Sequence, residues 1–147
     1  MSNRIYKNEV AVLSAEEIKE AFQDTFRQYV QGNLKKEQKL SYVYSERTEI
    51  GISDYDCFCH DEPHYHDVVT ETNYVISGKV GIYMLDTGEE YVVEAGGVFS
   101  FPPKVRHVLK MQAGTRIIFV KDHSIDDKHV IQEVRPELNA WYAKEYF

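Results

Sequence analysis

The chain has 147 residues, which is the size of one typical domain. Hydrophobic residues make up 43% and charged residues 28%, a globular composition that excludes wholesale disorder. The formal net charge of −7 argues against a nucleic-acid-binding protein, because that class needs a basic face. No apolar run approaches the roughly 18 residues of a membrane span, and the first residues lack the apolar stretch of a signal peptide. We therefore expect a soluble, single-domain, cytoplasmic protein.

Residues 14–30 follow a helical pattern near the start of the chain. Its apolar side chains recur at spacings of three and four, so they would share one face: Ile18, Phe22, Phe26 and Tyr29. Ser14 can serve as the N-cap, and Glu17 completes a capping box. The pattern predicts one amphipathic helix over 14–30. An edge strand within residues 1–13 would precede it, and a basic linker would follow it to residue 39.

From residue 40 onward the hydrophobic period changes to two, and turn residues separate the segments. The pattern predicts short strands over 41–47, 49–58, 68–76, 79–85, 90–93, 98–101, 105–112 and 115–121. Many short strands after a single helix indicate an all-β sandwich or small barrel, here residues 40–123. The tail, 124–147, is polar and then aromatic, and we expect a short helix that packs on the barrel. The N-terminal segment is then 1–39.

Three of the six histidines and one glutamate have a spacing that suits a metal site. In His64-Tyr65-His66 the two imidazoles would point to the same face of a strand, where both can bind one ion. Glu71 follows closely, and His107 lies on a predicted strand further along the chain. Imidazole and carboxylate together suit Zn, Fe, Mn, Ni or Cu. An H-x-H pair alone also arises by chance on exposed strands.

These four residues lie inside two longer motifs. His64-x-His66-x4-Glu71-x6-Gly78 resembles the first motif of the cupin superfamily, G-x5-H-x-H-x3,4-E-x6-G. Gly96-x5-Pro102-x-Lys104-x2-His107 resembles the second motif, G-x5-P-x-G-x2-H-x3-N. The resemblance covers about residues 58–111.

The resemblance departs from the family pattern at three positions. Phe58 and Lys104 stand where the motifs have glycine, and Met111 stands where the second motif has asparagine. The four ligand positions are intact. The resemblance implies a cupin-type jelly-roll β-barrel with an N-terminal helix, and one divalent transition metal per chain (Zn, Fe, Mn, Ni or Cu). The implied ligands are His64, His66, Glu71 and His107, with coordination positions left open for substrate or water.

The two cysteines allow a different metal site. Cys57-x-Cys59 together with the histidine pair would form a Cys2His2 set, and thiolates are good zinc ligands. That site would leave Glu71 and His107 unexplained, and it lacks the usual cysteine spacing. We expect both thiols to be reduced strand residues, one of which approaches the pocket.

Several other polar side chains are candidates for the pocket. The cations that could bind a phosphate or carboxylate are Arg47, Arg106, Arg116 and Lys104. The tyrosines that could transfer a proton or stack on a ring are Tyr42, Tyr44, Tyr55, Tyr74 and Tyr83. The histidines outside the motifs, expected in turns or solvent, are His60, His123 and His129. The choice of a catalytic residue among these candidates requires knowing which face of each strand points inward.

Three functions are consistent with a metal-binding cupin, because the fold alone does not determine the activity. The first is an isomerase, or a related proton-transfer enzyme, acting on a sugar or sugar derivative. The second is a metal-dependent dioxygenase or oxidative decarboxylase, and the third is a non-catalytic cupin that binds a small ligand. The basic residues beside the second motif favour a polar anionic substrate, and hence the first function. The expected partners are a small molecule and a second copy of the chain in a homodimer, without nucleic acid or membrane.

Overall fold

The computed structural model describes residues 3–6 and 8–147, which form thirteen short strands and two short helices. One sheet has the strand order β1 (Arg4–Ile5), β3 (Tyr42–Tyr44), β2 (Arg27–Gly32), β4 (Glu49–Tyr55), β12 (Thr115–Lys121), β7 (Glu71–Ser77) and β10 (Val98–Phe101). The other sheet has the order β13 (Lys128–Val130), β6 (His64–His66), β11 (His107–Met111), β8 (Lys79–Met84) and β9 (Glu90–Glu94), with β5 (Cys59–His60) paired to β11. The helices are α1 (Ala15–Ala21) and α2 (Pro136–Ala143).

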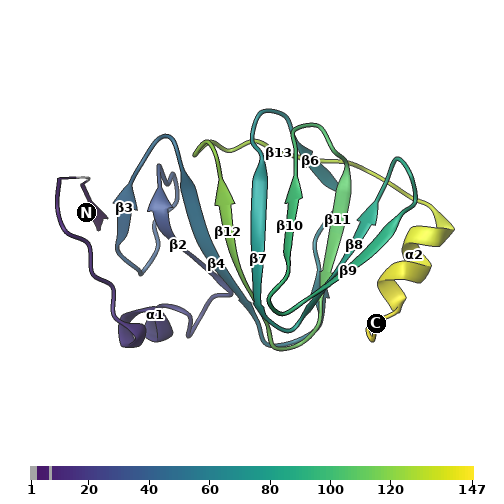
Figure 1. The fold of residues 1–147 in the computed structure, drawn as a ribbon, viewed down its shortest axis with the longest axis horizontal. Coiled ribbons are helices and arrows are strands. Elements are labelled where there is room, and N and C mark those ends of the chain that lie inside the picture. The colour runs from purple at the N-terminus through teal and green to yellow at the C-terminus, as the bar shows by residue number, and fades with distance from the viewer. Residues whose placement is uncertain (1–2, 7) are drawn as a thin grey trace.

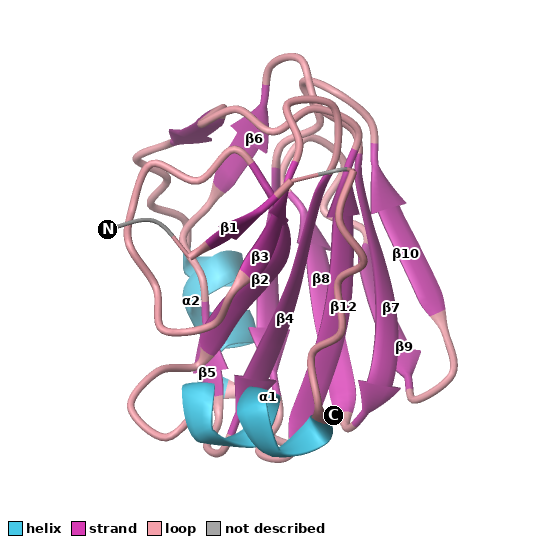
Figure 2. Ribbon diagram, turned by 90° about the vertical axis from the view of Figure 1, so that its left-hand side faces the viewer, coloured by secondary structure: helices cyan, strands magenta, loops and turns pink. Residues whose placement is uncertain are grey.

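The two sheets pack face to face as an open jelly roll (Figure 1). The strand pairs are antiparallel except for β1 with β3 and β2 with β3, which are parallel. The helices α1 and α2 lie at opposite ends of the long axis of the molecule. In the perpendicular view α1 lies across one end of the seven-stranded sheet (Figure 2). These features confirm the predicted all-β class with an N-terminal helix.

Alternation along the strands separates the interior from the surface, as the period of two predicts. On β7, Glu71, Asn73 and Val75 point inward, whereas Tyr74 and Ile76 point outward and are exposed. The apolar core between the sheets contains Tyr55, Val75, Val80, Ile82, Phe99, Phe101, Met111 and Ile117. Each of the eight predicted segments contains a strand, with bounds that differ by a few residues.

The predicted helix over 14–30 is wrong in its second half, because α1 ends at Ala21. Its start is confirmed: the Ser14 hydroxyl accepts a hydrogen bond from the Glu17 backbone N–H at 3.1 Å. The Glu17 carboxylate in turn accepts one from the Ser14 N–H at 3.3 Å, so the capping box is complete.

Residues 22–26 of that segment form a turn and a bend, and from Arg27 onward the chain is strand β2, which pairs antiparallel with β4. Phe26 and Tyr29 fit a helical spacing, but tertiary contacts outweigh it: the Tyr29 ring meets the Phe119 ring edge-on at 5.7 Å. Aromatic and β-branched residues such as these also favour strands. The short strands β5 and β13 were not predicted either, and only the histidine pair indicated β6.

The predicted N-terminal edge strand is present over Arg4–Ile5, where β1 pairs with β3 at the edge of the sheet. The rest of that prediction falls partly on residues 1, 2 and 7, which lie outside the described residues. The division of the chain at residues 39 and 123 stays a prediction. No helix within residues 3–6 and 8–147 is long and apolar enough to cross a membrane.

In the tail, α2 packs on the outer face of the six-stranded sheet. Leu138 and Trp141 are buried in a cluster with Tyr83, Leu85 and Val108. Lys110 on β11 is itself only 2% exposed, and its Nζ donates hydrogen bonds to the carbonyls of Trp141 (2.7 Å) and Lys144 (2.8 Å). Burial lowers the pKa of Lys110, while the two carbonyls at the end of the helix satisfy its donors.

Trp141→Ala should destabilise the whole fold, because the indole anchors α2 to the sheet and lies 4.5 Å from the Lys110 ammonium. We expect the free energy of unfolding to fall by about 3–5 kcal/mol, measured by chemical denaturation. Tyr146→Ala, in the same tail but 87% exposed, is the matched control and should leave stability unchanged. Equal effects of the two substitutions would contradict the anchoring role of Trp141.

Candidate functional site

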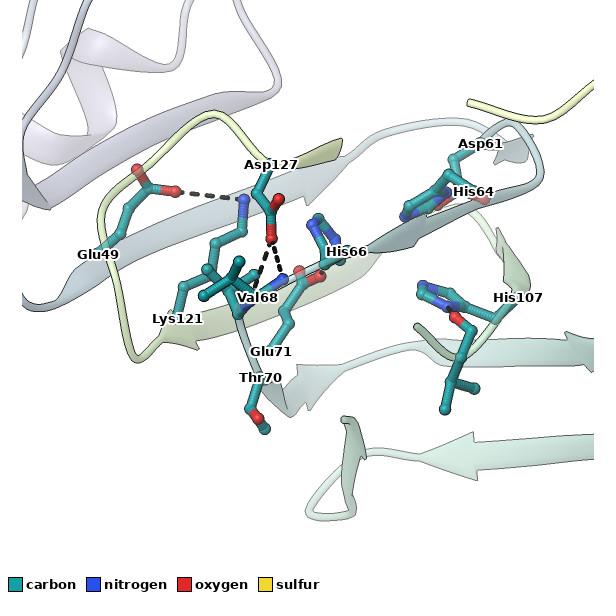
Figure 3. A network of polar contacts seen from close by, with 12 residues as sticks. Glu49, Asp61, His64, His66, Val68, Thr70, Glu71, His107, Lys121 and Asp127 are labelled. Carbon is teal, nitrogen blue, oxygen red and sulfur yellow. Dashed lines mark hydrogen bonds and ion pairs between the residues drawn. The ribbon is translucent and has the colours of Figure 1, made fainter. Parts of the chain in front are cut away.

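A cavity of about 520 Å³ lies between the sheets and is lined by residues from both. From the six-stranded sheet, β6 contributes His64 and His66, and from the other sheet β7 contributes Glu71. His107, on β11, packs against His64 with a ring-centroid distance of 4.4 Å (Figure 3). Three of the four side chains that the motifs single out therefore line the cavity, and the fourth, His107, lies against His64 without being among the lining residues.

The strand pairing explains this convergence. His64 and His66 are two residues apart on β6, so both side chains point inward and are buried. β6 pairs antiparallel with β11 so that His64 lies opposite His107. Glu71 begins β7 in the facing sheet and reaches across the cavity, where its Oε2 lies 3.1 Å from His66 Nε2.

Hydrogen bonds to backbone carbonyls orient two of the imidazoles. Nδ1 of His64 lies 2.6 Å from the Glu62 carbonyl, and Nδ1 of His107 lies 2.9 Å from the Val105 carbonyl. A carbonyl only accepts, so each Nδ1 carries the proton and each Nε2 keeps its lone pair. The Nε2 of His107 and both ring nitrogens of His66 are buried without a hydrogen bond of proper geometry. Such unpartnered acceptors are costly, and a ring held through Nδ1 with Nε2 free is the usual arrangement of a metal ligand.

The electrostatics of the site favour the protonation states that ligands need. Burial lowers the pKa of His64 to about 3 and that of His107 to about 4, so both rings are neutral at neutral pH. Burial alone would raise the pKa of Glu71, but the contact with His66 and the charge of Lys121 bring it down to about 2. Neutral imidazoles beside an ionised carboxylate are a competent ligand set for a divalent ion.

The potential ligand atoms of His64, His66, Glu71 and His107 lie farther apart than the ligand atoms around a bound ion. Of the described residues, one group of three has potential ligand atoms all within 4.8 Å of one another: Asp67, Asp127 and His129. Asp127 in that group already accepts hydrogen bonds from the backbone N–H groups of Val68 and Val69, and its two companions are exposed. The predicted tetrad is more widely spaced, so an ion would have to draw its side chains inward. The cysteines do not belong to the closely spaced group.

Three cations of the cavity wall were not predicted from the sequence: Arg27, Lys121 and Lys128. Arg27 lies in the segment 14–30, which was predicted to be a helix, so the sequence did not indicate that Arg27 lines a cavity between sheets. Lys121 Nζ lies 3.3 Å from the Glu49 carboxylate. A second cavity of about 500 Å³ shares all three cations. Asp61 also lines the first cavity, where its Oδ1 accepts a hydrogen bond from the Leu109 N–H at 2.7 Å.

The cations that the sequence did single out lie elsewhere, and none of them lines the cavity: Arg47, Arg106, Arg116 and Lys104. Arg106 instead donates a hydrogen bond of 2.8 Å to the exposed Asp86. Lys104 has a φ of 70°, the left-handed conformation that glycine adopts readily, which explains why the family motif has glycine there. Its N–H donates to the His66 carbonyl at 2.6 Å, so the backbone role of that position is retained.

The remaining candidates divide between the cavity and the rest of the fold. Of the five tyrosines, Tyr55 lines the cavity. Cys57 and Cys59 line it too, as free thiols, and burial raises the pKa of Cys59 to about 11. His60 lies at the cavity wall, and the centre of its ring lies 4.0 Å from that of Tyr142. His123 and His129 are exposed, as expected.

Comparison with known proteins points to one family. The chain matches the model of the Cupin domain over residues 59–120. Among solved structures it is similar to the polyketide cyclase RemF from Streptomyces resistomycificus, with a TM-score of 0.56, 17% identity, and coverage of 65% of this chain and 74% of that one. An RmlC-like cupin from Shewanella frigidimarina has a TM-score of 0.52 and 20% identity, with coverage of 68% and 77%. No sequence among the curated proteins matches.

A chain from the crystal structures of DMSP lyases is also similar, with a TM-score of 0.51 and 14% identity. The match covers 60% of this chain and 46% of the lyase chain, so this chain spans less than half of that protein's length. At these identities the structural likeness concerns the fold alone. The family match over residues 59–120 covers both histidine motifs, and the similar structures share the jelly roll that the two sheets form, so the chain has the fold of the cupins.

Proposed function

We propose that this cupin is a metal-dependent enzyme acting on a small molecule. Its ligands would be His64, His66, Glu71 and His107, with one divalent transition metal per chain. The observation that carries the proposal is the buried Nε2 of His107, which has no hydrogen-bond partner and lies in the same cluster as the ionised Glu71. A divalent ion accepts such lone pairs and balances the carboxylate charge.

The chemistry of the cavity suits proton transfer. A bound metal would supply Lewis acidity, which polarises a carbonyl or hydroxyl oxygen of the substrate. Asp61 is positioned to move the proton, because its Oδ1 is held by the Leu109 N–H while its other oxygen lies 3.8 Å from His64 Nδ1 in the cavity wall. The Tyr55 hydroxyl lines the same cavity. The substrate would be a sugar or sugar derivative, since the volume and the mixed polar and apolar wall fit a ligand of that size.

The metal assignment is tested by removing two ligands together. We expect the purified protein to carry about one equivalent of metal per chain by elemental analysis, and the double variant His64→Ala and His66→Ala should lose it. The matched control, His123→Ala with His129→Ala, removes two exposed imidazoles and should keep the metal. Metal retained by the first variant would refute the site. Metal lost by the control would assign it to the group that contains His129 instead.

The reaction class is tested with an oxygen electrode. A panel of sugars, sugar phosphates, keto acids and diketones should yield product by isomerisation or related proton transfer, without oxygen uptake. Product formation should be lost in His107→Ala. Oxygen consumed in proportion to product, and dependent on His107, would show a dioxygenase instead. Tight binding of a compound without turnover would show a non-catalytic ligand-binding cupin.

We also propose that the chain forms a homodimer through the outer face of the seven-stranded sheet. Apolar side chains gather there on β7, β10 and β12 and are exposed: Tyr74, Ile76, Val98 and Val120. Tyr74 pairs across the strands with Val98 on one side and with Ile118 on the other, so these residues form a continuous surface. A contiguous apolar surface of this kind on a sheet is typical of an interface.

Light scattering at micromolar concentration tests the dimer. The wild-type mass should be twice the 17.2 kDa of one chain. Tyr74→Lys should halve it, because a charge in the centre of the apolar surface would be buried without a partner. Val134→Lys, at a site that is exposed and remote from these strands, is the control and should remain dimeric. A monomeric wild type would contradict the proposal.

A further inference from the structure

The side chain of Arg27 is held rigidly in the cavity wall. Arg27 opens β2 and pairs with Ser53 of β4. Its Nε donates a hydrogen bond to the Ser53 hydroxyl at 2.9 Å, and its Nη2 donates one to the Tyr55 hydroxyl at 3.4 Å. The guanidinium carbon lies 5.2 Å from the centre of both the Phe26 and the Phe119 ring. These contacts fix the plane of the guanidinium before any ligand arrives.

The charge of Arg27 is not neutralised by the protein. Among the described residues, no carboxylate lies within ion-pair distance of it, and Nη1 makes no hydrogen bond. Burial by itself would lower the pKa of Arg27. The nearby Tyr55 and Tyr29 and the charge of Glu71 favour the protonated guanidinium more strongly, so the pKa of Arg27 is raised. A cation that is held in a cavity, stays charged and lacks a counter-ion is suited to bind an anionic ligand.

A second unpartnered donor lies in the wall of the same cavity. Asn73 is 3% exposed, lines the same cavity, and its Nδ2 has no hydrogen-bond partner. Asn73 pairs across the strands with Phe119, the residue whose ring packs on the Arg27 guanidinium. It also points to the same side of β7 as Glu71, two residues away. The two donors thus lie on either side of Phe119, with the predicted ligand cluster next to Asn73.

On this geometry, and resting on the proposed function, we infer that Arg27 and Asn73 form a subsite for the carboxylate of an organic acid. The acid would extend from this subsite to the cluster of His66 and Glu71, which would bind its hydroxyl or carbonyl oxygens. One guanidinium fork and one neutral amide match the single charge and the planar shape of a carboxylate. The substrate class is therefore a sugar acid or a similar polyhydroxy acid. A neutral sugar could accept hydrogen bonds from both donors but would leave the charge of Arg27 without a counter-ion.

Calorimetric titration of the purified holoprotein with two probes tests the subsite. D-Glucuronate and D-glucuronamide have the same hydroxyls and differ in the charge of one group. We expect wild-type protein to bind glucuronate about ten- to a hundredfold more tightly, the effect of a charged hydrogen-bonded pair. Arg27→Gln should abolish this preference while the metal content stays unchanged. Arg47→Gln removes an exposed cation outside the cavity and should preserve it.

Two further variants keep the test decisive if Arg27→Gln fails to fold. Arg27→Lys retains the charge without the fork and should reduce the preference, and Asn73→Ala should weaken glucuronate binding more than glucuronamide binding. Equal affinity of the wild type for both probes would overturn the inference, as would equal weakening of both probes in every variant.

Metal content, measured on the same samples, separates this inference from the proposed function. Metal-bearing protein without a preference for glucuronate would refute the subsite alone. A preference in protein that binds no metal would refute the metal site and retain the subsite.

Discussion

The pairing of β6 with β11 is the constraint on which the site depends. β6 is three residues long and lies between β11 and β13, with His64 opposite His107. A shift of one residue would turn both imidazoles of β6 to the outside. Backbone contacts next to the strand hold the register: the Lys104 N–H donates to the His66 carbonyl, and Asp127 accepts from the N–H groups that follow (Figure 3).

The interior between the sheets has two different regions. Around Val75, Val80 and Ile82 it is apolar and close-packed, as a core should be. Around Glu71 and Arg27 it is polar and hollow, and some buried donors and acceptors there lack partners. Such groups reduce stability, and they persist where a ligand satisfies them. This is why both proposals, the metal centre and the carboxylate subsite, concern the same cavity.

Local periodicity predicted much of the fold. Alternation located β7, β8, β10 and β12 and indicated which side chains of β7 point inward. It failed around Phe26 and Tyr29, because their spacing matches one face of a helix, whereas Phe26 lies in the bend before β2 and Tyr29 lies on β2 with its ring against Phe119 of the same sheet. β6 and β5 are too short to show a period at all, although the histidine motif marked the first of them.

The sequence by itself determined the strand-rich class, the capping box of α1 and the spacing of the four potential ligands, because each depends on residues close in the chain or on a motif. The tertiary structure alone decided which cations reach the cavity. Arg27 comes from the start of β2 and Lys121 from the end of β12, and both reach the cavity because β4 pairs with both of these strands. Pairing between distant segments depends on the packing of the whole chain, so no local pattern identified Arg27 as a wall residue, whereas alternation alone placed Asn73 on the same face of β7 as Glu71.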